Sequence, residues 1–306
     1  MLWVVVPAFN EAEALPTVVP WILEQVRAVD PKGQVLVVDD GSTDRTSEVV
    51  RGLVAEHEGV RLETLRHNRG KAAALQRGFA AALAEGATEI AMMDADGQDD
   101  PGELSRLLAR LDEGADLVTG ARLVRRDRFV KRTTSRFYNS TTALISGAPG
   151  RDFNSGFKLM RAEVAEDVSP MLYGEMHRYL TVIAHHSGHR VAEVPVEHHP
   201  RIAGSSKYGI ARFWRGFADL VTVRFLLAYE NRPSHLFSGV GLASMLLGTL
   251  ALAYLGVLKV TGDAIGGRPL LITAVMLVTV GLQLVLFGLL AELVVHARNV
   301  NRRERL

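Results

Sequence analysis

The stretch EIAMMDADGQDDP, residues 89–101, predicts in order a buried strand, an acidic turn and the start of a helix. Residues 90–93 form an apolar run without clean alternation, which is typical of a strand covered on both faces of a sheet. A turn rich in acids follows at 94–100, and Pro101 suits the first position of a helix, where its missing N–H does no harm. The stretch is therefore one strand–turn–helix unit of an α/β fold.

The same unit recurs on both sides of this stretch. We expect further strands at 2–6, 35–38, 60–65, 116–119 and 190–196, and helices at 42–56, 70–85, 101–111 and 175–186. Ser42 and Thr43, placed just before Asp44, indicate a helix start. Strands joined by helices in this order form a mostly parallel sheet, which binds ligands at the C-terminal ends of its strands. We therefore predict a Rossmann-like α/β domain over residues 1–208.

Apolar residues are concentrated near the C-terminus. Hydrophobic residues make up 48% of the chain although 23% of it is charged, and the stretches 236–258 and 269–291 contain no charged side chain. At ~1.5 Å per residue each helix would reach roughly 35 Å, slightly more than the ~30 Å hydrocarbon core of a bilayer. Two buried helices of a soluble protein are the alternative, but such helices are rarely this long without charge. Residues 233–306 are therefore expected to form a two-helix transmembrane anchor with a basic tail.

Arginines gather on the outer ends of the two expected spans. They are Arg212, Arg215, Arg224 and Arg232 before the first span, and Arg298, Arg302, Arg303 and Arg305 after the second. By the positive-inside rule, both termini and the catalytic domain are then cytoplasmic. Residues 209–232 carry an apolar stripe that predicts an amphipathic helix at the membrane interface, with an ordinary surface helix as the alternative. A net charge of +1 offers no basic footprint for nucleic acid.

Asp94 and Asp96 are the first candidates for chemistry. Carboxylates at positions i and i+2 of a strand end point to the same side, because side chains alternate along a strand. Hard divalent ions such as Mg²⁺ or Mn²⁺ take oxygen ligands from one or two carboxylates and complete their shell with water and phosphate. With the amide oxygen of Gln98 nearby, the pattern favours a metal–diphosphate site. A solvated acidic turn ahead of the next helix is the alternative interpretation.

Three further features lie at neighbouring strand ends. The run DDGSTD at 39–44 offers an acid to a ribose hydroxyl or a base N–H, although it would also suit a helix-capping turn. The run PAFNE at 7–11 closes the first strand in the same way. Lys71 opens a helix, so its charge and the helix dipole favour an anion. The P-loop spacing is missing there, as is a GxGxxG fingerprint after the first strand.

Together these motifs fall in the order and spacing of the GT-A glycosyltransferases of the large inverting family, family 2. Within it the chain resembles the polyprenyl-phosphate glycosyltransferases, the dolichol-phosphate mannose synthase group and its bacterial relatives, over essentially its whole length. The residues that carry the resemblance are PAFNE at 7–11, VDDGSTD at 38–44, NRGKAAALQRGF at 68–79, DADGQDDP at 94–101, DFNSGFKLM at 152–160 and RIAGSSKY at 201–208. A two-span C-terminal anchor also occurs in that group.

The resemblance implies roles for individual residues. The nucleoside would be held by Pro7, Phe9, Glu11, Val38 and Asp40. The metal would be bound by Asp94, Asp96 and Gln98, with Ala95 between the acids also against the donor. The phosphates would be bound by Arg122, Arg201 and Lys207. We add Lys71 to the donor site because of its charge at a helix N-terminus.

The expected acceptor is a lipid-linked phosphate. A phosphate monoester, whose second pKa is about 6, is largely dianionic at pH 7 and needs cations rather than a general base. We assign Arg132, Arg136, His177 and Arg178 to the acceptor phosphate, and Asp96, Arg122, His177 and Arg178 to catalysis. The run EMHRY at 175–179 resembles the bacterial undecaprenyl-phosphate relatives rather than the dolichol mannose synthases. An ordinary amphipathic helix face explains His177 and Arg178 equally well.

We therefore predict an inverting, metal-dependent transfer of a sugar from GDP-mannose or a UDP-hexose to a polyprenyl phosphate of the undecaprenyl or dolichyl type, in a bacterial or archaeal cell membrane. A homo-oligomer is a further expectation. One alternative is a hydroxyl acceptor on a glycolipid or polysaccharide, with Glu175 as the catalytic carboxylate, and another is a membrane scaffold with an inactive transferase domain. A zinc site is disfavoured because no cysteine accompanies His185, His186, His189, His198 and His199.

Overall fold

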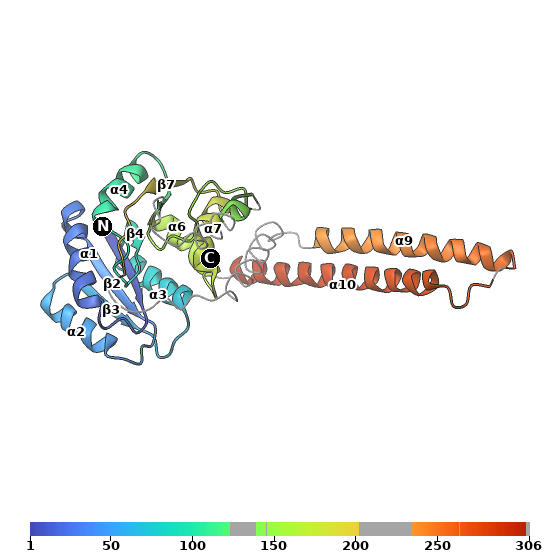
Figure 1. The fold of residues 1–306 in the computed structure, drawn as a ribbon, viewed down its shortest axis with the longest axis horizontal. Coiled ribbons are helices and arrows are strands. Elements are labelled where there is room, and N and C mark those ends of the chain that lie inside the picture. Colours follow the sequence, from blue (N-terminus) through green and yellow to red (C-terminus); the bar gives the residue numbers. More distant parts are fainter. Residues whose placement is uncertain (123–138, 145, 202–233, 263, 304–306) are drawn as a thin grey trace. The chain divides into compact units, whose positions relative to one another are not determined.

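A computed structural model of the chain describes residues 1–122, 139–144, 146–201, 234–262 and 264–303 (Figure 1). The chain divides into two compact units, residues 1–224 and 225–306, which are described separately. Three predicted phosphate-binding residues, Arg132, Arg136 and Lys207, lie outside the described residues, as does the expected interfacial helix at 209–232. Their roles stay predictions.

The first unit is built on one seven-stranded sheet. Its strands are β1 (Leu2–Ala8), β2 (Gln34–Asp39), β3 (Val60–Thr64), β4 (Glu89–Met92), β5 (Leu117–Ala121), β6 (Lys158–Arg161) and β7 (Val191–Pro195). They are arranged in the order β3-β2-β1-β4-β6-β5-β7. All pairings are parallel except those of β6 with β4 and β5. The mostly parallel sheet that the sequence predicts is confirmed.

Helices cover both faces of this sheet. The α-helices are α1 (Leu15–Val29), α2 (Thr46–Glu56), α3 (Lys71–Ala84), α4 (Leu104–Asp112), α6 (Ala162–Val168) and α7 (Leu180–His186), with 3₁₀ turns η1 (Pro101–Glu103), η2 (Ser169–Met171) and η3 (Met176–Tyr179). Val4 and Val6 share a buried core with α1, α2 and α4. The intervening Val5 faces α3, where a Cβ on Gly78 would lie 2.3 Å from its Cγ1. Because side chains alternate along β1, this strand packs against the helix layers on both faces of the sheet.

We did not predict α1, β6, α6 or η2. The segment of α1 contains two prolines, but Pro16 lies in the first turn, where no backbone hydrogen bond is lost. Six apolar side chains on one face of α1 are buried, and this packing stabilises the helix. Strand β6 has only four residues and is antiparallel, so the apolar run that marks it is too short to distinguish from a helix segment.

The expected helix at 42–56 begins at Thr46 instead, because the residues before it form a turn. Asp39 Oδ1 accepts from the backbone N–H of Ser42 at 2.9 Å, and Asp44 Oδ1 accepts from that of Thr46 at 2.9 Å. Gly41 has a φ of +65°, and a Cβ there would lie 2.5 Å from the His67 carbonyl carbon. The sequence therefore needs glycine at this turn.

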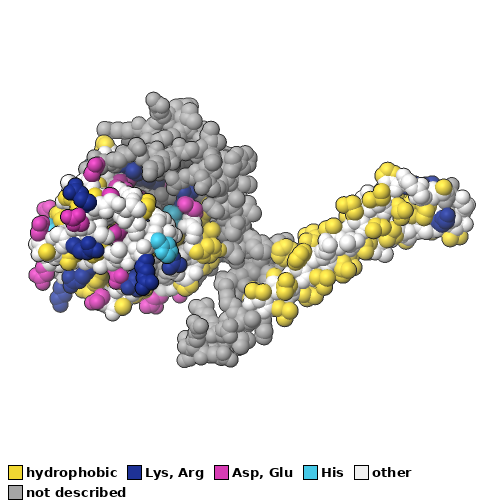
Figure 2. All heavy atoms as spheres, turned by 90° about the horizontal axis from the view of Figure 1, so that it is seen from below, with side chains coloured by type: hydrophobic (Ala, Val, Ile, Leu, Met, Phe, Trp, Pro, Cys, Tyr) yellow, Lys and Arg dark blue, Asp and Glu magenta, His cyan; other side chains and the backbone are white. Residues whose placement is uncertain are grey.

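The second unit consists of α9 (Ser234–Val260) and α10 (Pro269–Arg303), two helices packed against each other. Glycine allows the two helices to pack closely, because it has no Cβ. A Cβ on Gly241 would lie only 2.6 Å from the carbonyl oxygen of Gly281. The apolar segments Phe237–Val260 and Pro269–Val295 have mean hydropathies of 1.9 and 2.5, and only 17% and 11% of their most apolar windows are buried. Hydrophobic side chains cover much of the helix surface (Figure 2). These are two candidate transmembrane helices, and a buried soluble pair would show the opposite burial.

Candidate active site

A cavity of about 200 Å³ lies at the C-terminal ends of β1, β2 and β4. Its wall consists of Pro7, Ala8, Phe9, Glu11, Asp40, Lys71, Ala74, Asp94, Ala95, Asp96 and Arg201. Most of the residues that the sequence assigns to the donor are therefore brought together in one place. Val38 is an exception, because it is fully buried against α3 and is not part of the described wall.

Four carboxylates, those of Glu11, Asp40, Asp94 and Asp96, line this cavity. Burial raises the pKa of Glu11, and repulsion from Asp96 and Asp94 raises it further. Burial also raises the pKa of Asp96, with repulsion from Asp94 as the next cause. Burial is thus the main cause of both raised pKa values, and repulsion between neighbouring carboxylates adds to it. A group of carboxylate oxygens of this kind fits a hard divalent cation such as Mg²⁺ or Mn²⁺.

Two cations pair with the two central acids. The Lys71 ammonium donates to Asp94 Oδ1, and Arg201 Nη2 lies 2.8 Å from Asp96 Oδ2. Burial alone would raise the pKa of Asp94, but the charge and the hydrogen bond of Lys71 hold it below its usual value. The charged groups of Lys71 and Arg201 therefore lie at the cavity wall, and each is paired with a carboxylate.

Asp40 sets the position of Lys71. Its two carboxylate oxygens accept from the backbone N–H groups of Arg69 and Gly70, both at 2.8 Å. These two residues directly precede α3, so the buried carboxylate fixes the start of the helix that begins with Lys71. Asp40 also lines the cavity, as the predicted contact with the nucleoside requires.

The PAFNE segment is fixed by the neighbouring DDGSTD turn. The backbone N–H of Asn10 donates to Ser42 Oγ at 2.9 Å, and Asn10 Oδ1 accepts from the backbone N–H of Thr43 at 2.9 Å. The backbone N–H of Glu11 donates to Thr46 Oγ1 at 3.0 Å. Asn10 has a φ of +56°, a conformation that asparagine tolerates better than most residues. These bonds hold Glu11 at the cavity.

Arg122 forms a buried ion pair that the sequence did not indicate. Its Nε lies 2.8 Å from Asp152 Oδ2, and its Nη2 lies 3.1 Å from Asp152 Oδ1. Burial would lower the pKa of Arg122, but the hydrogen bonds and charge of Asp152 raise it instead. The guanidinium is thus permanently charged, and it is fixed at the end of β5 by a carboxylate from a different segment.

The loop that contains Asp152 also reaches Asp94. Lys158 is fully buried, and its ammonium donates to the backbone carbonyls of Phe153 at 3.2 Å and Ser155 at 2.6 Å. Burial lowers the pKa of Lys158 to about 8. A Cβ on Gly156 would lie 2.6 Å from Asp94 Oδ2, so only glycine allows the loop to approach this acid. From the sequence, only the family resemblance pointed to this segment.

His177 and Arg178 are the described residues that we assigned to the acceptor phosphate. Burial lowers the pKa of His177 well below its usual range, and repulsion from Lys71 and Arg178 lowers it further. His177 is therefore neutral at pH 7, and its role at the acceptor phosphate stays a prediction. Its Nδ1 is buried without a hydrogen-bond partner in the described part of the chain. Arg178 Nη2 lies 2.7 Å from Glu175 Oε2, so its charge is already paired.

Gln98 lies beside the acids but not on the described cavity wall. Its backbone N–H donates to Asp96 Oδ1 at 3.1 Å, and its side-chain Nε2 lies 3.5 Å from the carbonyl oxygen of His199. In this conformation the Gln98 side chain contacts the segment that leads to Arg201. A role as a metal ligand would require its amide to turn toward the cavity.

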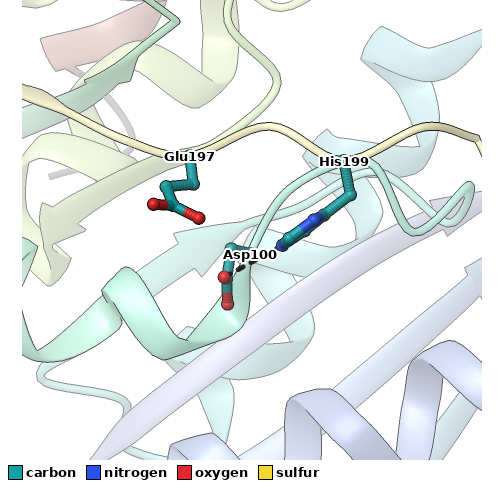
Figure 3. Close-up of side chains that lie close together, drawn as sticks. All are labelled: Asp100, Glu197 and His199. Carbon is teal, nitrogen blue, oxygen red and sulfur yellow. Dashed lines mark hydrogen bonds and ion pairs between the residues drawn. The ribbon is translucent and has the colours of Figure 1, made fainter.

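A second group of possible metal ligands lies next to this segment. Asp100, Glu197 and His199 point toward one another, with ligand atoms within 4.8 Å (Figure 3). Asp100 Oδ2 lies 3.0 Å from His199 Nε2, and Asp100 Oδ1 accepts from the backbone N–H of Gly102 at 2.8 Å. Hydrogen bonds therefore account for the position of Asp100 without an ion. Of the five histidines considered for zinc, His199 alone belongs to this group.

Solved structures define the class of fold. The structure of a mannosyltransferase from Pyrobaculum calidifontis, in complex with GDP-Man and Mn²⁺, matches with a TM-score of 0.56 and 22% identity over 75% of this chain and 64% of that one. Glucosyl-3-phosphoglycerate synthase from Mycobacterium tuberculosis matches with a TM-score of 0.52 and 20% identity over 74% of this chain and 79% of that one. The fold is that of the GT-A glycosyltransferases.

Sequence comparisons define the family. A family model described as glycosyl transferase family 2 matches residues 3–169. Dodecaprenyl-phosphate galacturonate synthase of Rhizobium johnstonii is 35% identical over 96% of this chain and 87% of its own. Undecaprenyl-phosphate 4-deoxy-4-formamido-L-arabinose transferase of Proteus mirabilis is 30% identical over 94% of this chain and 86% of its own. The chain belongs to glycosyl transferase family 2 and is a glycosyltransferase.

The contact between Gly156 and Asp94 leads to a testable prediction. In Gly156→Ala the new methyl group displaces the Asp94 carboxylate, and we expect sugar transfer to fall at least about tenfold, as for a misplaced catalytic group. Gly52→Ala is the matched control, because a Cβ at Gly52 in α2 meets nothing within 4 Å. Initial rates of both variants and their thermal unfolding are compared with wild type. Equal rates for the two variants would contradict the role of this contact.

Proposed function

We propose that the protein transfers a sugar from a nucleoside-diphosphate sugar to a polyprenyl phosphate at the cytoplasmic face of a bacterial or archaeal membrane. The observation that carries the proposal is the cavity that four carboxylates line together with Lys71 and Arg201. Relatives named for a dodecaprenyl and an undecaprenyl phosphate, each covering nearly the whole chain, support the acceptor. The two candidate transmembrane helices support a membrane location.

The relatives also bear on the sugar. Their names specify galacturonate and 4-deoxy-4-formamido-L-arabinose, and neither specifies mannose. Of the two donors expected from the sequence, GDP-mannose and a UDP-hexose, we therefore favour the UDP-hexose or a uronic acid derivative of it. The mannosyltransferase with GDP-Man shares only 22% identity and supports the fold.

Asp94 and Asp96 would hold Mg²⁺ or Mn²⁺, with Gln98 as a third oxygen ligand. When bound, the ion supplies positive charge to the departing diphosphate. Lys71 and Arg201, which contact these two carboxylates in this structure, would then donate to the diphosphate oxygens instead. We infer that these two cations exchange carboxylate partners for phosphate partners when the donor binds.

The acceptor supplies its own nucleophile. An oxygen of the phosphate dianion forms the bond to C1 of the sugar from the face opposite the leaving group, as the bond from C1 to the diphosphate oxygen breaks with inversion. No proton has to be removed from this oxygen at pH 7. Arg122, which is buried and permanently charged, is the described cation that would stabilise negative charge beside Asp94.

A hydroxyl acceptor is the second enzymatic candidate. It would need a free carboxylate as a general base, and the sequence offered Glu175 for this role. In the structure Glu175 is paired with Arg178 and is not part of the described cavity wall. Because Glu175 already contacts Arg178 and lies outside the described wall, this observation favours the phosphate acceptor.

One transfer assay tests the proposal. The full chain is reconstituted in vesicles with polyprenyl phosphate and labelled UDP- and GDP-sugars, and the label is extracted into organic solvent. We expect labelled lipid from a UDP-hexose or a UDP-hexuronate, and none after the divalent ion is removed with EDTA. Label transferred to a hydroxyl acceptor would favour the second candidate. The absence of transfer from every donor would favour the inactive scaffold.

The exchange of partners by Lys71 gives a second prediction. In Lys71→Met the diphosphate loses a cation, and we expect kcat/KM to fall about 10²-fold. Mn²⁺ binding should become tighter or stay equal, because the ammonium no longer competes for Asp94. Lys32→Met is the control, since Lys32 is exposed and precedes the N-terminal end of β2. Weaker Mn²⁺ binding together with full activity would contradict the exchange.

A further inference from the structure

Gln283 is a polar residue in an apolar environment. It lies near the middle of the apolar segment Pro269–Val295 of α10 and is exposed. The face of α10 that contacts α9 is a different one, formed by the buried residues Ala274, Gly281 and Gly288. In the described part of the chain the Gln283 amide has no hydrogen-bond partner.

An unpaired amide is costly at this depth of a membrane. Hydrocarbon offers no hydrogen bonds, so an amide without a partner there loses the hydrogen bonds that it would make in water. Three other polar side chains of the two helices avoid this loss within the chain. Ser244 donates to the carbonyl of Leu277 at 2.9 Å, Thr273 to that of Pro269 at 3.0 Å and Thr279 to that of Val275 at 2.9 Å. The amide of Gln283 therefore points to a partner outside the chain.

Gln283 lies within a regular seam. At spacings of three and four residues, exposed side chains follow one another along α10: Met276, Thr279, Gln283, Leu286, Leu290 and Leu293. This is the spacing of the a and d positions of a left-handed helix pair. A single amide at one such position sets the register and the number of helices, because it must meet a partner at the same level.

We propose that α10 forms a homodimer with α10 of a second copy of this chain, with the two Gln283 amides hydrogen-bonded to each other. A second copy in the same membrane presents the same amide at the same depth. A primary amide is both donor and acceptor, so it is complementary to itself across a two-fold axis. The proposal rests on the membrane anchoring in the proposed function, but it does not depend on the sugar donor or the acceptor.

Cysteine cross-linking tests this interface directly, because the chain contains no cysteine of its own. Single variants Leu286→Cys and Leu290→Cys place a thiol on the seam, and Leu289→Cys places one on an exposed position beside it. Each full-length variant is reconstituted in vesicles at low protein density and oxidised. We expect disulfide-linked dimers from the two seam positions and several-fold less from Leu289→Cys. Equal yields at all three positions would overturn the proposal.

The role of the amide is tested in the same background. Adding Gln283→Leu to Leu286→Cys should lower dimer formation about 3- to 30-fold, the range expected for an interhelical hydrogen bond in a membrane. Unchanged dimer formation would overturn the amide contact. Resistance of each variant to alkaline extraction from the vesicles is measured in parallel. Loss of this resistance in the wild type would refute the anchoring itself, whereas an inserted protein without cross-links refutes only the dimer.

Discussion

The concentration of negative charge at one end of the sheet is the constraint on which the site depends. Strands β1 and β4 are neighbours in parallel register, so Glu11 and the pair Asp94 and Asp96 follow the same edge. Burial raises the pKa values of Glu11 and Asp96, and repulsion between the acids raises them further. Two cations from other segments pair with these acids. Lys71, at the start of α3, contacts Asp94, and Arg201, in the chain after β7, contacts Asp96. A site so charged is prepared for a metal ion and a diphosphate.

The surrounding structure keeps these charges in place. Asp40 anchors the backbone ahead of Lys71, and Asp152 fixes Arg122 through two hydrogen bonds. The loop from Asp152 to Lys158 then reaches Asp94 through Gly156. Lys71 and Arg122 are thus each positioned by a buried carboxylate. Such support allows the site to bind charged ligands without first reorganising.

Sequence patterns predicted those parts of the molecule that depend on local order. Apolar runs and their spacing indicated the parallel strands, and the acid pair after β4 indicated the cavity. Helix α1 and strand β6 were not predicted, because tertiary packing stabilises them despite prolines or a short length. The Arg122–Asp152 pair and the Gly156 contact join residues that are distant in the chain. The neutral state of His177 follows from burial, which no local pattern encodes.

The central claim is that the acid pair forms a metal–diphosphate site. Titration of Mn²⁺ into the full-length protein, with and without a nucleoside diphosphate, measures this most directly when wild type and Asp96→Asn are compared. We expect one bound Mn²⁺ ion in the wild type and tighter Mn²⁺ binding with the nucleotide. In Asp96→Asn, whose fold is retained, we expect both the bound ion and the effect of the nucleotide to be lost. Equal Mn²⁺ binding by the two proteins would contradict this claim.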